Sequence, residues 1–228
     1  KKWLVYMSVF TYMGLNSMLV NAKEYLVADP QAYLDIAKKL EAGDIVTLAD
    51  GTWTDFQIAF SGQGTEDSPI TLQAQTAGKV ILTGESNLRL AGEYLLVSGL
   101  FFKDGHSPSN AVIEFRQSKT QLASHSRVTQ TVVESFNNPE KFSAGNWVAL
   151  YGRYNRFDHN ALVGKSTSGV TMAVKLNTVE SQENHHRIDH NYFGQRPILG
   201  SNGGETLRIG TSHYSLSNSY TMIENNYF

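Results

Sequence analysis

A short phrase returns along the chain and sets its organisation. It reads apolar, polar, polar, Asn, any residue, apolar, and it occupies residues 127–133, 157–163, 188–193 and 223–228. With one earlier related segment included, its apolar anchors are spaced by 31, 29, 31 and 35 residues, and they are Val97, Val128, Phe157, Ile188 and Ile223. A period of this size is typical of stacked repeats. Such a stack presents one long side wall, which suits an extended polymer as ligand.

Apolar segments of a second kind follow the anchors in step with them. They are residues 111–115, 147–151, 172–176 and 206–209. Two or three short strands per repeat of about thirty residues predict an all-β fold, a parallel β-helix solenoid. Because this period exceeds that of the tightest β-helices, we expect loops to bulge from the coils at residues 103–110, 137–146, 164–169 and 194–204.

One helix is expected ahead of the strands, over residues 29–40. Asp29 can cap it, Pro30 fits its first turn, and Gly43 ends it. Its apolar stripe consists of Tyr33, Leu34, Ala37 and Leu40. We expect this helix to cap the first coil. Strands are expected after it at residues 45–48, 52–58, 70–73, 80–82, 88–90 and 94–102.

An Asn holds the same place in three successive phrases, at Asn160, Asn191 and Asn226. In stacked strands, side-chain amides in register hydrogen-bond to one another along the axis. We therefore expect these residues to form a structural ladder and to take no part in catalysis.

The first residues differ in character from the rest. Two Lys residues are followed by an uncharged run over residues 3–20 and by small residues before Lys23. This pattern predicts an export signal over residues 1–22, a secreted or periplasmic protein, and one β-helix domain over residues 23–228. The alternative is a membrane anchor, since the run approaches spanning length, but Gly14, Asn16 and Ser17 weaken it. We expect no stable membrane association once the signal is removed.

Composition excludes some partners. A net charge of −2 argues against a nucleic-acid binder, which usually has a basic face. There is no Cys, so packing and hydrogen bonds hold the fold without disulfides. Walker, zincin, EF-hand and nucleophile-elbow motifs are also missing from the sequence. The end of the chain, at Phe228, falls within a repeat and lacks a cap, and we expect the natural polypeptide to continue.

Two constellations invite a functional reading. His186 and His190 would share one face of a helix and could bind zinc. They lie in a strand phrase, however, where His190 repeats the place of His159, so stacked or solvated imidazoles are favoured. Lys175 and Arg208 are 33 residues apart and each stands between apolar residues.

Aligning the segments around these two cations places Lys175 one coil from Arg208, both pointing outward. Outward cations on a solenoid wall can hold a polyanionic chain. The alternative is a solvated strand face, with Glu114 or Glu205 as the partner of the cations.

The second half of the chain resembles polysaccharide lyase family six, which includes alginate lyases and chondroitinase B. The resemblance covers residues 24–228 and is strongest from residue 155. It is carried by residues 186–193, Arg196 with Pro197, residues 201–212 (SNGGETLRIGTS), Ser215, Ser219 and residues 224–228, with weaker likeness at residues 51–53 and 99–102.

The resemblance implies a single-stranded right-handed parallel β-helix that cleaves uronate-containing polysaccharides by β-elimination. It implies a Ca²⁺ ion that neutralises the substrate carboxylate, a Lys base and a supporting Arg. Asn202 matches one calcium ligand of the family. The other ligands, the base and its Arg would follow Phe228, so we assign no catalytic residue and expect this chain alone to be inactive.

By the same resemblance Lys175 and Arg208 become expected substrate contacts, with Lys165 as a further candidate. The family's aromatic residue after the Arg-Ile-Gly motif is Thr211 here, which leaves the sugar-stacking surface unassigned.

The leading hypothesis is a lyase of an acidic polysaccharide, with alginate of the poly(β-D-mannuronate) type favoured over a sulfated glycosaminoglycan. No dense Arg cluster is visible that would grip sulfates in a bidentate manner. The alternatives are a non-catalytic carbohydrate-binding β-helix and a chondroitin or dermatan sulfate lyase. A hydrolase of pectin type would need clustered Asp carboxylates, whereas Asp158 and Asp189 belong to the structural phrase. The sequence leaves the oligomeric state open.

Overall fold

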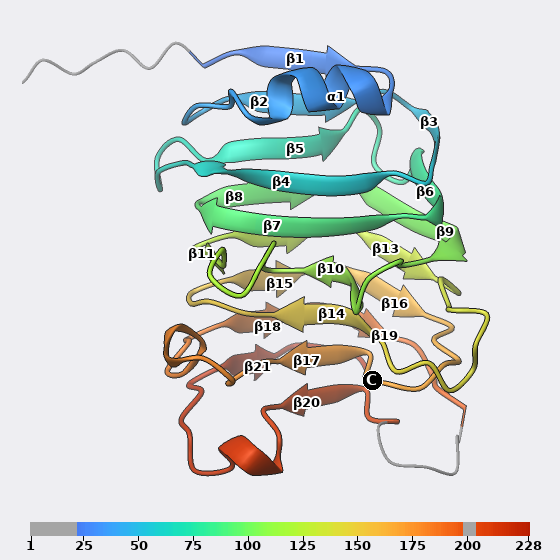
Figure 1. Ribbon diagram of the computed structural model, residues 1–228, viewed down its shortest axis with the longest axis vertical. Helices are drawn as coiled ribbons and strands as arrows, with labels where there is room; N and C mark the ends of the chain where they lie inside the picture. The colour runs from blue at the N-terminus through green and yellow to red at the C-terminus, as the bar shows by residue number, and fades with distance from the viewer. Residues whose placement is uncertain (1–21, 198–203) are drawn as a thin grey trace, which may run out of the picture.

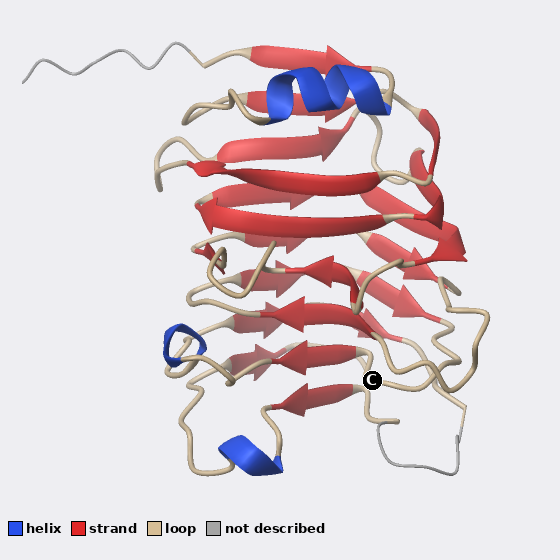
Figure 2. Cartoon of the chain, in the orientation of Figure 1, coloured by secondary structure: helices blue, strands red, loops and turns tan. Residues whose placement is uncertain are grey.

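The computed structural model describes residues 22–197 and 204–228. The chain winds into stacked coils, and each full coil gives strands to three parallel sheets, so the fold is a parallel β-helix (Figure 1). Among the described residues α1 (Pro30–Ala37) is the only α-helix, and two single turns of 3₁₀ helix are η1 (Val179–Ser181) and η2 (Ser212–Tyr214). The predicted all-β class is therefore confirmed, and strands make up most of the regular structure in Figure 2.

The sheets follow one another along each coil and are called sheets 1, 2 and 3 in that order. Sheet 1 contains β1 (Glu24–Val27), β2 (Ile45–Leu48), β5 (Ile70–Ala74), β8 (Leu95–Ser98), β12 (Arg127–Thr129), β15 (Arg156–Asp158), β18 (Arg187–Asp189) and β21 (Met222–Glu224). Sheet 2 contains β3 (Gly51–Thr54), β6 (Val80–Glu85), β9 (Leu100–His106), β13 (Val132–Glu134), β16 (Ala161–Val163) and β19 (Tyr192–Phe193). Sheet 3 contains β4 (Gln57–Gln63), β7 (Asn87–Glu93), β10 (Ala111–Glu114), β11 (Ala123–Ser124), β14 (Asn146–Leu150), β17 (Met172–Val174) and β20 (Leu207–Ile209), and most of it faces the viewer in Figure 1.

The predicted anchors stack on one another in sheet 1. The register pairs Val97 with Val128, Val128 with Phe157, Phe157 with Ile188, and Ile188 with Ile223. The first four anchors are completely buried, so the repeat period is set by one column of core side chains. Full burial of a side chain of this size contributes about 1.5–3 kcal/mol.

Helix α1 lies against the first coils at the N-terminal end of the stack (Figure 1). The Asp29 carboxylate accepts a hydrogen bond from the Ala32 N–H at 2.8 Å, as a helix cap does. Tyr33 is fully buried, packs edge-on against Phe56, and donates its hydroxyl to the Ala59 carbonyl at 2.9 Å. The helix ends at Ala37, before the predicted stop at Gly43, and still covers the core as predicted.

The Asn ladder is also confirmed. The Asn191 side-chain oxygen accepts hydrogen bonds from the backbone and side-chain N–H groups of Asn160 at 3.0 and 3.1 Å. Asn226 accepts from Asn191 in the same way, at 2.9 and 3.0 Å. Each amide thus satisfies buried polar groups of the neighbouring coil at the turn that leaves sheet 1.

The predicted export signal, apart from Ala22, lies outside the described residues. Within the part of the chain that the structure describes, no helix is long and apolar enough to cross a bilayer.

Candidate functional site

A hollow lies on the outward face of sheet 3. One outward column of this sheet runs through Arg89, Glu114, Ala149, Ala173 and Arg208, each paired with the next. Glu114, the small Ala149 and Arg208 of this column line the hollow. The resulting pocket has a volume of about 480 Å³, and we call it the sheet 3 pocket.

Arg116, Tyr151 and Glu114 form one wall of the sheet 3 pocket. The Arg116 guanidinium lies 3.9 Å from the centre of the Tyr151 ring and donates from Nε to the Glu114 carboxylate at 2.7 Å. Burial raises the pKa of Tyr151 to about 12, although the charge of Arg116 opposes this. The wall therefore offers a protonated phenol, and its carboxylate already has a cationic partner.

Lys175 and Arg208 line the same pocket without a carboxylate partner. Within residues 22–197 and 204–228, neither forms an ion pair, and the buried Arg208 Nε has no hydrogen-bond partner. Burial, then the charges of Arg208 and Arg116, lower the pKa of Lys175. Two cations without an acidic partner in one pocket are chemically suited to an anion.

The expected register of these two cations is wrong. Arg208 pairs with Ala173, and Lys175 lies two residues further along its strand direction. Because side chains alternate along a strand, residues 173 and 175 still face the same way. The pair therefore converges on the sheet 3 pocket diagonally and does not form a vertical column.

Lys165 lies elsewhere, at a second pocket of about 590 Å³. Only 2% of its surface is exposed, and its Nζ donates to the Thr167 carbonyl, the Thr167 hydroxyl and the Ser168 carbonyl at 3.4, 3.1 and 3.2 Å. Burial, then the charge of Arg196, lowers the pKa of Lys165 to about 7. All three ammonium donors are occupied, and its role as a substrate contact stays a prediction.

Comparisons with known proteins agree with this architecture. The family model described as chondroitinase B matches residues 27–228. The chain belongs to the chondroitinase B family. Among solved structures, AlyGC, an alginate lyase of the PL6 family, is 65% identical, with a TM-score of 0.88 over 90% of this chain. A mannuronic acid specific family 6 lyase from human gut microbiota is 34% identical, with a TM-score of 0.83 over 90% of this chain.

A family 6 polysaccharide lyase from Pseudopedobacter saltans is 28% identical, with a TM-score of 0.79 over 89% of this chain. The chain spans 28%, 48% and 46% of the lengths of these three structures, respectively. Pectate lyase Pel9A, at 14% identity and a TM-score of 0.52, shares the fold alone. A search of curated proteins found no match.

The calcium ligand expected from the family pattern, Asn202, lies outside the described residues. Among the residues that are described, no group of three or more His, Asp or Glu side chains could hold a metal ion. We derive no step through the ion.

His159 and His190 stack as the sequence favoured, whereas His186 is buried. His159 and His190 stack with ring centres 4.9 Å apart, and each binds the carboxylate of the residue before it, Asp158 or Asp189. His186 is buried and accepts the Asn155 N–H on Nδ1 at 3.1 Å. Burial lowers the pKa of His186 to about 3, so it is neutral.

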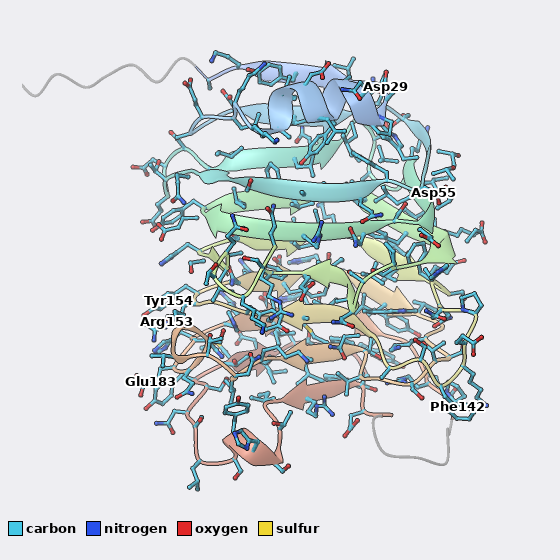
Figure 3. All side chains as sticks on the ribbon, viewed as in Figure 1. Asp29, Asp55, Phe142, Arg153, Tyr154 and Glu183 are labelled. Atoms are coloured by element: carbon cyan, nitrogen blue, oxygen red, sulfur yellow. The ribbon has the colours of Figure 1, made fainter. Side chains whose placement is uncertain are left out.

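An aromatic stack was missed by the sequence analysis. It runs along the turn that enters sheet 1, with ring centres 4.8–5.3 Å apart, through Tyr94, His125, Tyr154, His185 and Tyr220. All five residues have a left-handed φ of 50–56°. Their spacings of 31, 29, 31 and 35 residues equal those of the anchors, so the same repeat could have revealed them. Figure 3 shows Tyr154 at the margin of the molecule, on the side opposite Phe142.

Proposed function

We propose that the chain is part of a polysaccharide lyase and that the sheet 3 pocket binds the carboxylates of an acidic, uronate-containing polysaccharide. The observation that carries the proposal is the pair Lys175 and Arg208, which face this pocket with no acidic partner among the described residues. Membership of the family and the lyases found among its relatives support an enzyme.

The reaction proposed is β-elimination: the ring carbon that bears the carboxylate loses its proton, the bond from the neighbouring carbon to the glycosidic oxygen breaks, and a C=C double bond forms between the two carbons while the leaving oxygen takes up a proton. The hard step is removal of the proton next to the carboxylate. The carboxylate already carries a negative charge, and a second one develops only once the first is neutralised. Lys175 and Arg208 would hold carboxylates along the chain, and Tyr151 would donate a hydrogen bond from its phenol. We assign no catalytic base within this chain, because the resemblance places the Lys base and its Arg after Phe228.

Alginate is the favoured substrate. Sulfate groups are commonly gripped by clustered guanidinium groups in bidentate geometry. In the sheet 3 pocket the Arg116 guanidinium is already paired with Glu114, which leaves Arg208 and the single point charge of Lys175. One relative described as an alginate lyase and another described as a mannuronic acid specific family 6 lyase support a poly(β-D-mannuronate) substrate.

Calcium assistance is part of the proposal and rests on the resemblance alone, with Asn202 as one ligand. In the complete protein, Asn202→Ala should raise the calcium concentration needed for half-maximal activity. An unchanged calcium response would remove Asn202 from the metal site. Export to the periplasm or the medium is likewise proposed from residues 1–22.

The binding role is tested by titrating the chain with oligouronates in isothermal calorimetry. Each of Arg208→Ala and Lys175→Ala should weaken binding about 10- to 100-fold, as loss of a hydrogen bond to a charged group does. Arg153→Ala is the matched control, because its guanidinium donates to the Val179 carbonyl at another pocket. Equal affinities for all four proteins would overturn the proposal.

A non-catalytic carbohydrate-binding β-helix remains the second candidate, since an anion pocket alone serves binding as well as catalysis. The complete protein separates the two. A lyase releases unsaturated uronates that absorb in the ultraviolet, whereas a binder leaves the absorbance unchanged.

A further inference from the structure

The loop over residues 137–146 brings an exposed aromatic ring to the sheet 3 pocket. Phe142 lines this pocket together with Lys175 and Arg208, although 69% of its surface is exposed. Figure 3 shows Phe142 at the margin of the molecule. Single exposed apolar residues are common on protein surfaces. The position of this one, beside unpaired cations, is what calls for an explanation.

The loop that carries Phe142 is braced against the neighbouring coil. The Lys141 carbonyl accepts the Ser168 N–H at 2.9 Å, and the Gly145 N–H donates to the Ser168 carbonyl. Gly169 has a φ of +84°, and a Cβ there would lie 2.4 Å from the Gly145 oxygen, so the two backbones meet closely. The loop base is therefore fixed, and Phe142 is presented from a supported position.

The other aromatic ring of the pocket is not available for stacking. Tyr151 is 5% exposed, and the Arg116 guanidinium covers its face at 3.9 Å. Among the described residues that line the sheet 3 pocket, Phe142 is then the only aromatic side chain with an open face. The Lys141 ammonium lies over the Phe142 ring, 5.6 Å from its centre, and adds positive charge there.

We propose that Phe142 is a sugar-stacking residue that holds a saccharide unit next to the one whose carboxylate binds Lys175 and Arg208. A pyranose ring has an apolar C–H face, and the negative face of an aromatic ring attracts such C–H groups. The ligand is a uronate oligosaccharide, with its carboxylates on the cations and one ring face on Phe142. The inference rests on the proposed function, because it names a second contact for the same ligand.

The proposal predicts a dependence on ligand length. The chain is titrated with oligomannuronates of increasing length in EDTA buffer. Phe142→Ala should weaken binding of the longer oligomers about three- to tenfold and leave the shortest binding oligomer unaffected. Phe142→Trp should keep or raise the affinity for the longer oligomers. Tyr192→Ala, which removes an exposed ring on the outer face of sheet 2, is the control and should change nothing.

The outcomes separate this inference from the proposed function. If Arg208→Ala weakens binding while Phe142→Ala binds every length as the unaltered chain does, the stacking role is wrong and the anion pocket stands. An equal loss for Phe142→Ala and Tyr192→Ala also overturns the stacking role. If neither Arg208→Ala nor Phe142→Ala changes affinity, the proposed function itself fails. Circular dichroism and melting temperature check that each variant is folded.

Discussion

Arg156 and Asp189, from neighbouring coils, form a two-point ion pair on the outer face of sheet 1. The Arg156 Nε lies 2.9 Å from Asp189 Oδ1, and its Nη2 lies 2.6 Å from Oδ2. Arg127 holds Asp158 in the same way, and Arg187 continues the series to Glu224. The Asp189 carboxylate is completely covered by these neighbours, so each pair ties one coil to the next.

Loss of one Arg in this series should destabilise the stack. Arg156→Met leaves Asp189 buried with weaker support from Arg187 and His190. We expect the free energy of unfolding to fall by about 1–3 kcal/mol, the cost of an unsatisfied buried acceptor. Urea unfolding measures it, with Arg153→Met as the control. A variant as stable as the unaltered protein would show that the pair does not hold the coils together.

The Asp189 carboxylate should make the free energy of unfolding depend on pH in the acidic range. Burial alone would raise the pKa of Asp189, but hydrogen bonds from Arg156 and His190 and the charges of Arg156 and Arg187 lower it to about 2. Since this value lies below the ordinary 3.8, the stabilisation is present above pH 4 and is lost as the pH falls toward 2.

The gap in unfolding free energy between the unaltered protein and Asp189→Asn should therefore narrow over this range. Asp67→Asn, at an exposed position, is the control. A gap that is constant with pH would contradict the prediction.

The Asn ladder offers a second test of coil stacking. Asn191→Ala removes the acceptor of the Asn160 N–H and the donor to the Phe157 carbonyl, both in the buried turn. We expect a loss of about 1–3 kcal/mol for each group left unpaired. Asn177→Ala, at an exposed position, should be neutral. Similar unfolding midpoints for the two variants would mean that the Asn ladder does not stabilise the stacked coils.

Lys165 should make stability rise with pH in the alkaline range. Its folded-state pKa of about 7 lies below the ordinary value of 10.5, so the unfolded chain binds more protons between these limits. The free energy of unfolding should therefore increase with pH from 7 to 10, by at most about 1.4 kcal/mol per pH unit. Lys165→Met should remove this slope, and exposed Lys119→Met should keep it. An unchanged slope in Lys165→Met would show that the amine does not titrate there.

Much of the fold could be predicted from the repeat period in the sequence. Val128, Phe157 and Ile188 could be aligned because each is a large apolar residue between polar neighbours, which fixes one inward position per coil, and Val97 and Ile223 follow at the same period. The Asn ladder followed from the same alignment. The helix ends earlier than predicted. Its last residue is followed by Lys38, whose side chain gives no stop signal, whereas Gly43 is a typical residue after a helix end and led to the longer prediction.

The site was harder to predict. Alternation along residues 172–176 places Ala173 and Lys175 on the same outward face, but it does not show which of the two pairs with Arg208 of the next coil. The predicted alignment paired Lys175 with Arg208, which is two residues away from the observed pairing of Ala173 with Arg208. Lys165 hydrogen-bonds to Thr167, two residues along the same loop, but the ring of Trp147, 5.9 Å from its ammonium, comes from β14. No local signal in the sequence records the contact with Trp147.

Above all, we propose that Lys175 and Arg208 bind the carboxylates of a uronate chain in the sheet 3 pocket. The most direct measurement compares the affinity of the chain for an oligomannuronate with its affinity for the same oligomer after its carboxylates are reduced to alcohols. We predict that the acidic oligomer binds, more weakly as salt is raised, and that the neutral one does not bind measurably. Equal affinity for both oligomers would contradict the account.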